Sequence, residues 1–137
     1  MFATYSPVRH WIFVAVFSVF TALTACTNSV ASDFVSLNQA RAYHEAGKVM
    51  LVDIRENSEH MTGVAKGAML LPMSELPQKL SMLPKNLDQP VLLICNTQNR
   101  SKVTFEMLKQ QGYKNIRYVE GGMSQWAANG WPMVVPN

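Results

Sequence analysis

Short apolar runs alternate with helix-like segments along most of this chain, and this alternation limits the folds that it can adopt. Four mostly apolar runs predict strands: 49–54, 68–71, 91–94 and 116–119. The segments between and around them predict helices: 37–46, 74–83, 101–111 and 123–129. Strands that alternate with helices favour an α/β domain with a mostly parallel central sheet.

The third apolar run leads into the strongest candidate site. Val91–Ile94 passes directly into Cys95, a short loop and a helix. A strand that enters a helix through a short loop directs the loop's N–H groups and the helix N-terminus at one point. Positive potential there stabilises a thiolate, and Arg100 adds a full charge. The segment predicts an anion cradle with a nucleophile at its floor. Its residues are Cys95, Asn96, Thr97, Gln98, Asn99, Arg100 and Ser101.

Other polar residues follow the remaining strands of the predicted sheet. Ligands of parallel sheets bind beyond the carboxyl ends of the strands, where Asp53, Cys95 and Glu120 all lie. We predict supporting roles for Asp53, as a brace of the loop, and for Arg55. Arg55 and Glu56 either serve the site or form a charge pair that fixes the loop after the strand.

Composition excludes several function classes. The formal net charge is only +3 and no basic block stands out, so nucleic acid is not a predicted partner. No Cys/His cluster has the spacing of metal ligands, so we predict no metal and no other cofactor. His44 and His60 lack partners at such spacing and are expected at the surface.

The N-terminal residues predict export. Arg9 precedes the apolar run Trp11–Leu23, which suits a signal-peptide core but is short for a membrane-spanning helix. The run closes on Leu23–Cys26, which resembles the lipobox of bacterial lipoproteins, in which the cysteine carries lipid. An ordinary secretory signal cut after Ser29–Ala31, or an uncleaved anchor, are the alternatives. All three place the domain outside the cytoplasm, on the periplasmic side, and the first would anchor it to a membrane.

We therefore divide the chain into a signal peptide of the lipoprotein type (1–25), a tether (26–33) and one domain (34–135). Lipidation of Cys26 would leave Cys95 without an intrachain partner. A lone thiol in an oxidising compartment is a liability, which favours a chemical role for Cys95. The alternative is a buried structural cysteine that packs as a small hydrophobe.

Four segments in order resemble the rhodanese-like domain family, over residues 34 to 133. Asp53–Glu56 is similar to its D-x-R-E, and Glu59–Pro72 to its E-Y-x-x-G-H-I-x-G-A-x-x-x-P. Cys95–Ser101 fits the active-site loop, and Gly121–Pro132 fits the closing G-G-x-x-x-W-x-x-x-G-x-P. The resemblance implies a three-layer α/β domain similar to small exported single-domain bacterial rhodaneses, acting as a monomer.

The resemblance also implies a thiosulfate sulfurtransferase that needs no cofactor. Cys95 would attack the outer sulfur of thiosulfate, release sulfite and become a persulfide. A thiol or cyanide would then accept the sulfur. The loop from Asn96 to Ser101 would bind the donor, and Arg100 would hold donor oxygens or brace the loop.

Two loop residues depart from the family pattern. Gln98 stands where many active members have glycine, so it must adopt a strained positive φ or reshape the loop. Asn96 replaces a basic residue, which weakens the attraction for anions. Both departures favour a persulfide or polysulfide donor, or a protein thiol partner, over thiosulfate.

Two other functions compete with sulfur transfer. An oxyanion (arsenate) reductase or a phosphatase-like enzyme could use a similar loop. Cysteine phosphatases need C-x5-R, whereas Cys95 to Arg100 is C-x4-R, so the shorter loop favours sulfur. A catalytically silent, membrane-tethered binding module is the third possibility, supported by Asn96 and Gln98 and opposed by the retained Cys95 and Arg100.

Overall fold

Five parallel strands form one central sheet. The computed structural model describes residues 32–137 together with Met1. The strand order is β1-β5-β4-β2-β3, and all four neighbouring pairs are parallel. The strands are β1 (Phe34–Val35), β2 (Met50–Asp53), β3 (Met69–Leu70), β4 (Val91–Ile94) and β5 (Ile116–Val119). The predicted α/β fold with a parallel sheet is confirmed, and β4 is its central strand.

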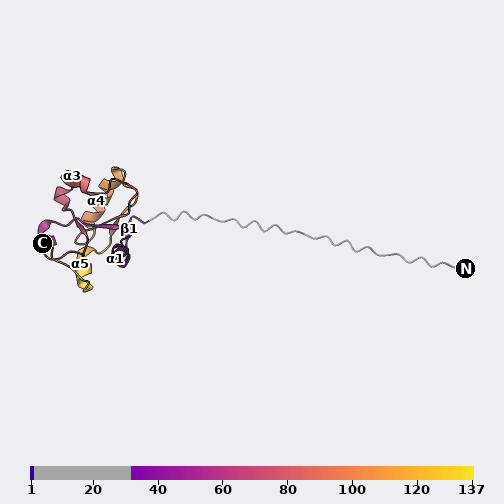
Figure 1. The fold of residues 1–137 in the computed structure, drawn as a ribbon, viewed down its shortest axis with the longest axis horizontal. Helices are drawn as coiled ribbons and strands as arrows, with labels where there is room; N and C mark the ends of the chain where they lie inside the picture. Colours follow the sequence, from indigo (N-terminus) through magenta and orange to yellow (C-terminus); the bar gives the residue numbers. More distant parts are fainter. Residues whose placement is uncertain (2–31) are drawn as a thin grey trace.

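Helices cover both faces of this sheet. They are α1 (Leu37–Glu45), α2 (Asn57–His60), α3 (Leu76–Lys79), α4 (Asn99–Gln110) and α5 (Gly122–Ala128). Two 3₁₀ turns, η1 (Met73–Glu75) and η2 (Leu80–Met82), flank α3. In Figure 1 α3 and α4 lie on one side of the sheet, and α1 and α5 on the other.

Burial on both faces explains why the central strand is apolar throughout. Leu93 and Cys95 belong to the core beneath α3 and α4, whereas Leu92 and Ile94 belong to the core beneath α1 and α5. Alternate residues of a strand point to opposite faces, so both sets must be apolar. Each fully buried leucine contributes about 2 kcal/mol through the hydrophobic effect. As a result β4 holds the residue that follows it at a fixed position.

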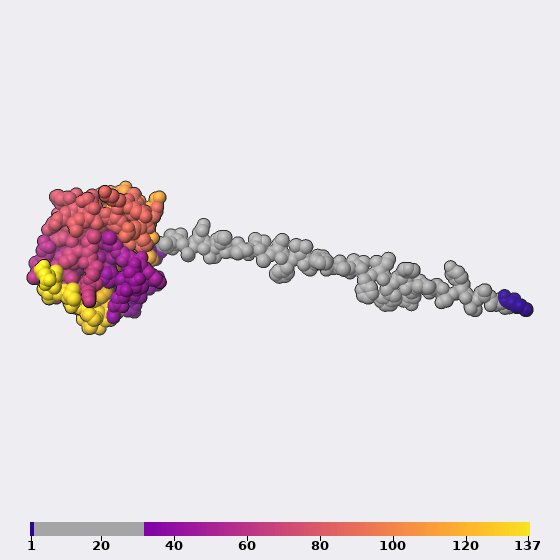
Figure 2. Space-filling view, in the orientation of Figure 1, coloured from indigo at the N-terminus to yellow at the C-terminus, as the bar shows by residue number. Residues whose placement is uncertain are grey.

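The C-terminal segment packs on the domain. Val64 and Val134 form an antiparallel bridge, and the ring of Trp131 lies edge-on to Trp126, with 5.0 Å between ring centroids. The guanidinium of Arg41, in α1, lies 4.7 Å from the Trp131 ring. Figure 2 shows the C-terminal residues, in yellow, on the surface beside purple residues from the start of the domain. Trp126 is buried in the core, as its apolar character predicts.

The structure differs from the predicted elements in three places. The two-residue β1 was not predicted, because it is too short for a periodic pattern. The single helix expected at 74–83 is instead η1, α3 and η2 in succession. It is interrupted because Lys79 leaves the helical region, with φ −114° and ψ 17°. Helix α4 begins two residues earlier than predicted, at Asn99.

The predicted signal peptide (1–25), the lipidation site Cys26 and most of the tether lie outside the described residues. Within the part of the chain that the structure describes, no helix has the length and apolarity needed to cross a membrane.

Candidate active site

Cys95 lies at the carboxyl end of the central strand. Asp53, the last residue of β2, is the register partner of Ile94, so Asp53 and Cys95 lie at the same edge of the sheet. Glu120 follows the neighbouring strand β5 at this edge. The structure therefore brings together the three strand ends that the sequence predicted to meet. Cys95 itself is only 1% exposed.

The N-terminus of α5 packs against the loop that begins at Cys95. The amide of Met123 donates to the carbonyl oxygen of Cys95 at 2.8 Å, and that of Ser124 donates to Asn96 at 2.9 Å. A Cβ on Gly122 would lie 2.3–2.6 Å from the carbonyl oxygens of Cys95, Asn96 and Thr97. Only glycine can therefore occupy position 122, where φ is also positive at 60°.

This packing orients the loop's amides. In a trans peptide the N–H points opposite to the carbonyl of the same unit. Since the carbonyls of Cys95, Asn96 and Thr97 face α5, the N–H groups of Asn96, Thr97 and Gln98 face away from it. Within residues 32–137 none of these three N–H groups has a hydrogen-bond acceptor. The loop thus presents free donors, as the predicted anion cradle requires.

The sulfur of Cys95 has one backbone donor and one hydroxyl partner. The N–H of Ser101 points to Sγ at 3.4 Å, and Oγ of Ser101 lies 3.5 Å from Sγ. The Ser101 hydroxyl in turn donates to the carbonyl of Gln98 at 3.0 Å. Since a thiol can donate to Ser101 Oγ while a thiolate can only accept, the backbone N–H is the contact that favours the thiolate.

Gln98 fits the loop without the positive φ that favours glycine. Its φ is −160°, and no non-glycine residue among those described has a positive φ. The loop is therefore reshaped relative to one that needs glycine here. The Gln98 side chain accepts a hydrogen bond from the N–H of Gly121 at 3.4 Å. This contact ties the loop to the start of α5.

Arg100 is paired with a carboxylate from another element. Its guanidinium donates two hydrogen bonds to Glu59, at 2.6 and 2.7 Å. Both side chains are about one-third exposed. The hydrogen bond from Arg100, opposed in part by burial, lowers the pKa of Glu59 from 4.5 to about 2. The same bond raises the pKa of Arg100, and the negative charge of Glu59 adds to that effect. In this structure Arg100 therefore braces the loop against α2.

The free energy of unfolding should depend on pH through the ion pair between Glu59 and Arg100. Because the folded state lowers the pKa of Glu59, the pair's contribution is complete above about pH 4.5 and is lost as the pH falls toward 2. Partial exposure limits that contribution to about 1 kcal/mol. Urea unfolding of the wild type and of Glu59→Gln should differ by this amount at pH 7 and coincide near pH 2. A constant difference across that range would contradict this assignment.

A second ion pair, fully buried, fixes α2 to the sheet. Arg55 binds both carboxylate oxygens of Asp53, with a shortest distance of 2.7 Å, and donates to the carbonyls of Glu59 and Gly63. Asp53 thus braces the loop after β2, as predicted, but the partner of Arg55 is Asp53 and not Glu56. The predicted surface position of His60 is wrong. It is 2% exposed, and its Nε2 lies 3.5 Å from Asp53 without a hydrogen bond.

The sequence did not assign roles to Glu59 and Gly122. Both stand at positions of the family pattern, but 41 residues separate Glu59 from Arg100 and no local signal connects them. The contact of Gly122 with the Cys95 loop likewise depends on how β4 and α5 pack. A glycine pair at the end of a strand was the only sequence signal for it.

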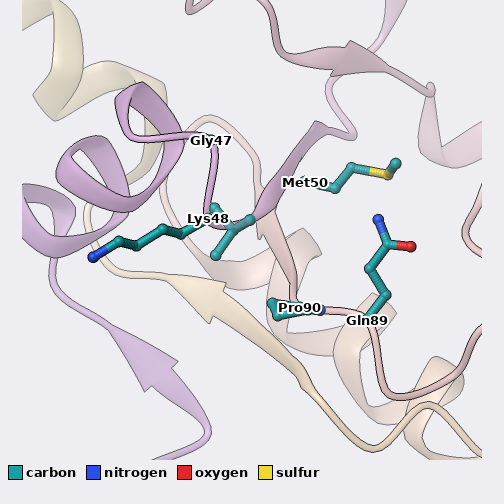
Figure 3. Close-up of a pocket in the computed structure, with 6 residues that line it drawn as sticks. Gly47, Lys48, Met50, Gln89 and Pro90 are labelled. Atoms are coloured by element: carbon teal, nitrogen blue, oxygen red, sulfur yellow. The ribbon is translucent and has the colours of Figure 1, made fainter.

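One hollow of the surface lies elsewhere in the domain. It has a volume of about 260 Å³ and is lined by Gly47, Lys48, Val49, Met50, Gln89 and Pro90. Figure 3 shows these residues, which lie just before β2 and β4 or, for Met50, at the start of β2. The hollow therefore lies at the amino ends of the strands, whereas Cys95 follows the carboxyl end of β4. Among the described residues no three His, Cys, Asp or Glu side chains form a potential metal site. The candidate active site is therefore identified by its chemistry and not by a large cavity.

Comparisons with known proteins identify the family of the domain. The model of the family described as "Rhodanese-like domain" matches residues 36–129. A sulfurtransferase of Allochromatium vinosum is 38% identical over 104 residues, which cover 76% of this chain and 94% of that protein.

Solved structures are similar as well. A rhodanese-related protein of Thermoplasma volcanium has a TM-score of 0.65 and 30% identity, covering 77% of this chain and all of that one. The human single-domain sulfurtransferase TSTD1 has a TM-score of 0.64 and 25% identity, over 71% and 96% of the two chains. With a parallel sheet, a cysteine loop at its carboxyl edge and these relatives, the chain belongs to the rhodanese-like domain family.

Proposed function

We propose that the domain is a sulfurtransferase that carries sulfane sulfur as a persulfide on Cys95. The observation that carries this proposal is the donor arrangement around Cys95. The Ser101 N–H points to Sγ, and three free loop N–H groups face away from α5. These donors would stabilise the thiolate and then the negative charge on the outer sulfur. The relatives named as sulfurtransferases support the same reaction.

The first half-reaction needs only groups of the loop and the donor. The Cys95 thiolate attacks the outer sulfur of the donor, a new S–S bond forms, and the donor's own S–S bond breaks with its electron pair on the leaving group. With thiosulfate the leaving group is sulfite. With a persulfide it is a thiolate. Since Cys95 is only 1% exposed, a slender terminal sulfur suits this approach.

We further propose that a persulfide or polysulfide is a better donor than thiosulfate. The loop residues Asn96, Thr97, Gln98 and Asn99 are all uncharged, and the one cation among residues 95–101, Arg100, is already paired with Glu59. A dianionic donor therefore finds hydrogen-bond donors in this loop but no free positive charge on the loop itself. The same pairing argues against a phosphate cradle, which needs its guanidinium for the substrate.

Steady-state kinetics test this function. Sulfur transfer to cyanide or a thiol should be measured with thiosulfate and with polysulfide, in the wild type and in Glu59→Gln. We expect a higher kcat/KM with polysulfide than with thiosulfate in the wild type. Glu59→Gln frees Arg100, so it should raise kcat/KM for thiosulfate several-fold and leave that for polysulfide within about twofold. Transfer from neither donor would contradict the proposed function.

We also propose that the chain is exported and anchored by lipid at Cys26. The lipobox-like Leu23–Cys26 after an apolar run supports this proposal. Full-length protein made in a Gram-negative bacterium should take up labelled palmitate and fractionate with membranes. Cys26→Ser should lose both properties. Unlabelled protein beginning after Ala31 would show an ordinary secretory signal instead.

A further inference from the structure

A small apolar groove lies between α3 and α4. Its volume is about 160 Å³, and it is lined by Met73, Leu76, Pro77, Val103, Thr104 and Met107. Five of these six side chains are apolar and none is charged. A space of about 150 Å³ is enough to hold a molecule of benzene. The groove therefore suits one neutral, apolar group of roughly the size of an aromatic ring.

This groove lies on the same side of the sheet as the nucleophile. Cys95 belongs to the core cluster that includes Leu76, and Met73 and Met107 pack against that cluster. Figure 1 shows α3 and α4 together on this side of the sheet. Along α4, Thr104 follows Arg100 by four residues, which is one helical turn or about 6 Å. The groove thus begins within a turn of the loop that holds Cys95.

Two features indicate that the groove receives a ligand. Thr104 lines it, is 1% exposed and carries a hydroxyl without a hydrogen-bond partner in the described chain. A buried hydroxyl left unpaired destabilises a protein by about 1–3 kcal/mol, and the negative face of an aromatic ring in the groove would accept a hydrogen bond from it. On the rim Val103 is 60% exposed, although it is apolar. The two methionines give the walls a shape that adapts to different ligands.

We propose that this groove binds the apolar body of the sulfur acceptor, which is a thiol with an aromatic ring near its sulfur. This inference rests on the proposed sulfurtransferase function. The acceptor thiolate attacks the outer sulfur of the Cys95 persulfide and forms a new S–S bond. The bond between that sulfur and Sγ breaks, its electron pair stays on Sγ, and the products are the acceptor persulfide and the Cys95 thiolate.

A matched pair of acceptors tests the proposal. 2-Phenylethanethiol and 2-mercaptoethanol carry the same CH₂CH₂SH group and differ in the phenyl ring. With the persulfide form of the wild type, kcat/KM should be at least about tenfold higher for 2-phenylethanethiol. Val103→Glu places a charge at the groove and should reduce this preference to within about twofold. Transfer to 2-mercaptoethanol should be unchanged, which shows that the loop is intact.

Val135→Glu is the control for the added charge. Val135 is 61% exposed, nearly the same as Val103, but lies in the C-terminal segment away from the groove. This variant should keep the wild-type preference for the aromatic thiol. Equal efficiency of the two thiols in the wild type would overturn the groove assignment, and so would loss of the preference in both variants.

A binding measurement separates failure of the groove from failure of the function. In Cys95→Ser, 2-phenylethanol should shift the NMR signals of the Met73 and Met107 methyl groups and leave that of the exposed Met61 unchanged. If no donor forms a persulfide, the proposed function fails and these shifts alone decide whether the groove binds apolar groups. If the persulfide forms but the shifts and the preference are absent, the groove proposal is wrong and the function stands.

Discussion

Replacing Cys95 with serine should lower sulfur transfer by at least about a thousandfold, because the hydroxyl of serine is not ionised at neutral pH and cannot carry sulfane sulfur. The loop offers no second nucleophile that could substitute for it. Ser101 is the nearest hydroxyl, at 3.5 Å from Sγ, but it already donates to the carbonyl of Gln98. The measurement is sulfur transfer from polysulfide and from thiosulfate to a thiol, at equal protein concentration.

The stability of the variant is the control for this prediction. Serine is close to cysteine in size, and Ser101 offers it hydrogen-bond partners at the same position. The free energy of unfolding should therefore change by only about 1 kcal/mol. Transfer that survives in a folded Cys95→Ser protein would contradict the persulfide mechanism.

Among substitutions that add a single methyl group, Gly122→Ala should have the largest effect on the loop that holds Cys95. The added Cβ would lie 2.3–2.6 Å from three carbonyl oxygens, so either the loop or the start of α5 must move. The positive φ of 60° adds about 1–2 kcal/mol for a residue with a side chain. Together with the clash, we expect a loss of about 3 kcal/mol in stability and a loss of most sulfur transfer.

Gly130→Ala separates the two contributions. Gly130 has nearly the same backbone angle, with φ 65°, but no atom lies within 4 Å of the position of its missing Cβ. Its replacement should lose only the backbone contribution, about 1–2 kcal/mol, and keep transfer close to wild type. Equal losses of stability and activity in the two variants would show that the contact between Gly122 and the loop has no special importance. Chemical unfolding and the transfer assay measure both effects.

Most of the fold could be predicted because its central strands, β2 and β4, are largely buried. A strand such as β4 must be apolar at every position, and that run is visible without any structure. The two-residue β1 carries no periodic signal, and the broken segment around α3 depends on how the chain turns at Lys79. Element type therefore followed from the pattern, whereas short elements and boundaries did not.

The chemistry of the candidate site could be predicted from the sequence, but the side chains that contact one another there could not. The strand, cysteine and helix are contiguous in sequence, so the position of Cys95 at the sheet edge followed directly. The partner of Arg100 lies 41 residues earlier in the chain, on a four-residue helix. The sequence does not indicate that His60 is buried, because a polar residue in a short helix is more often exposed. Contacts that tertiary packing creates were therefore missed.

The most direct test of the central claim is the intact mass of the reduced domain, residues 32–137, after incubation with polysulfide and separately with thiosulfate. We expect the mass of the wild-type domain to increase by that of one sulfur atom, and a thiol to remove this sulfur. Cys95→Ser should never gain it. A mass that stays unchanged with both donors in the folded wild type, or an equal gain in Cys95→Ser, would contradict a persulfide on Cys95.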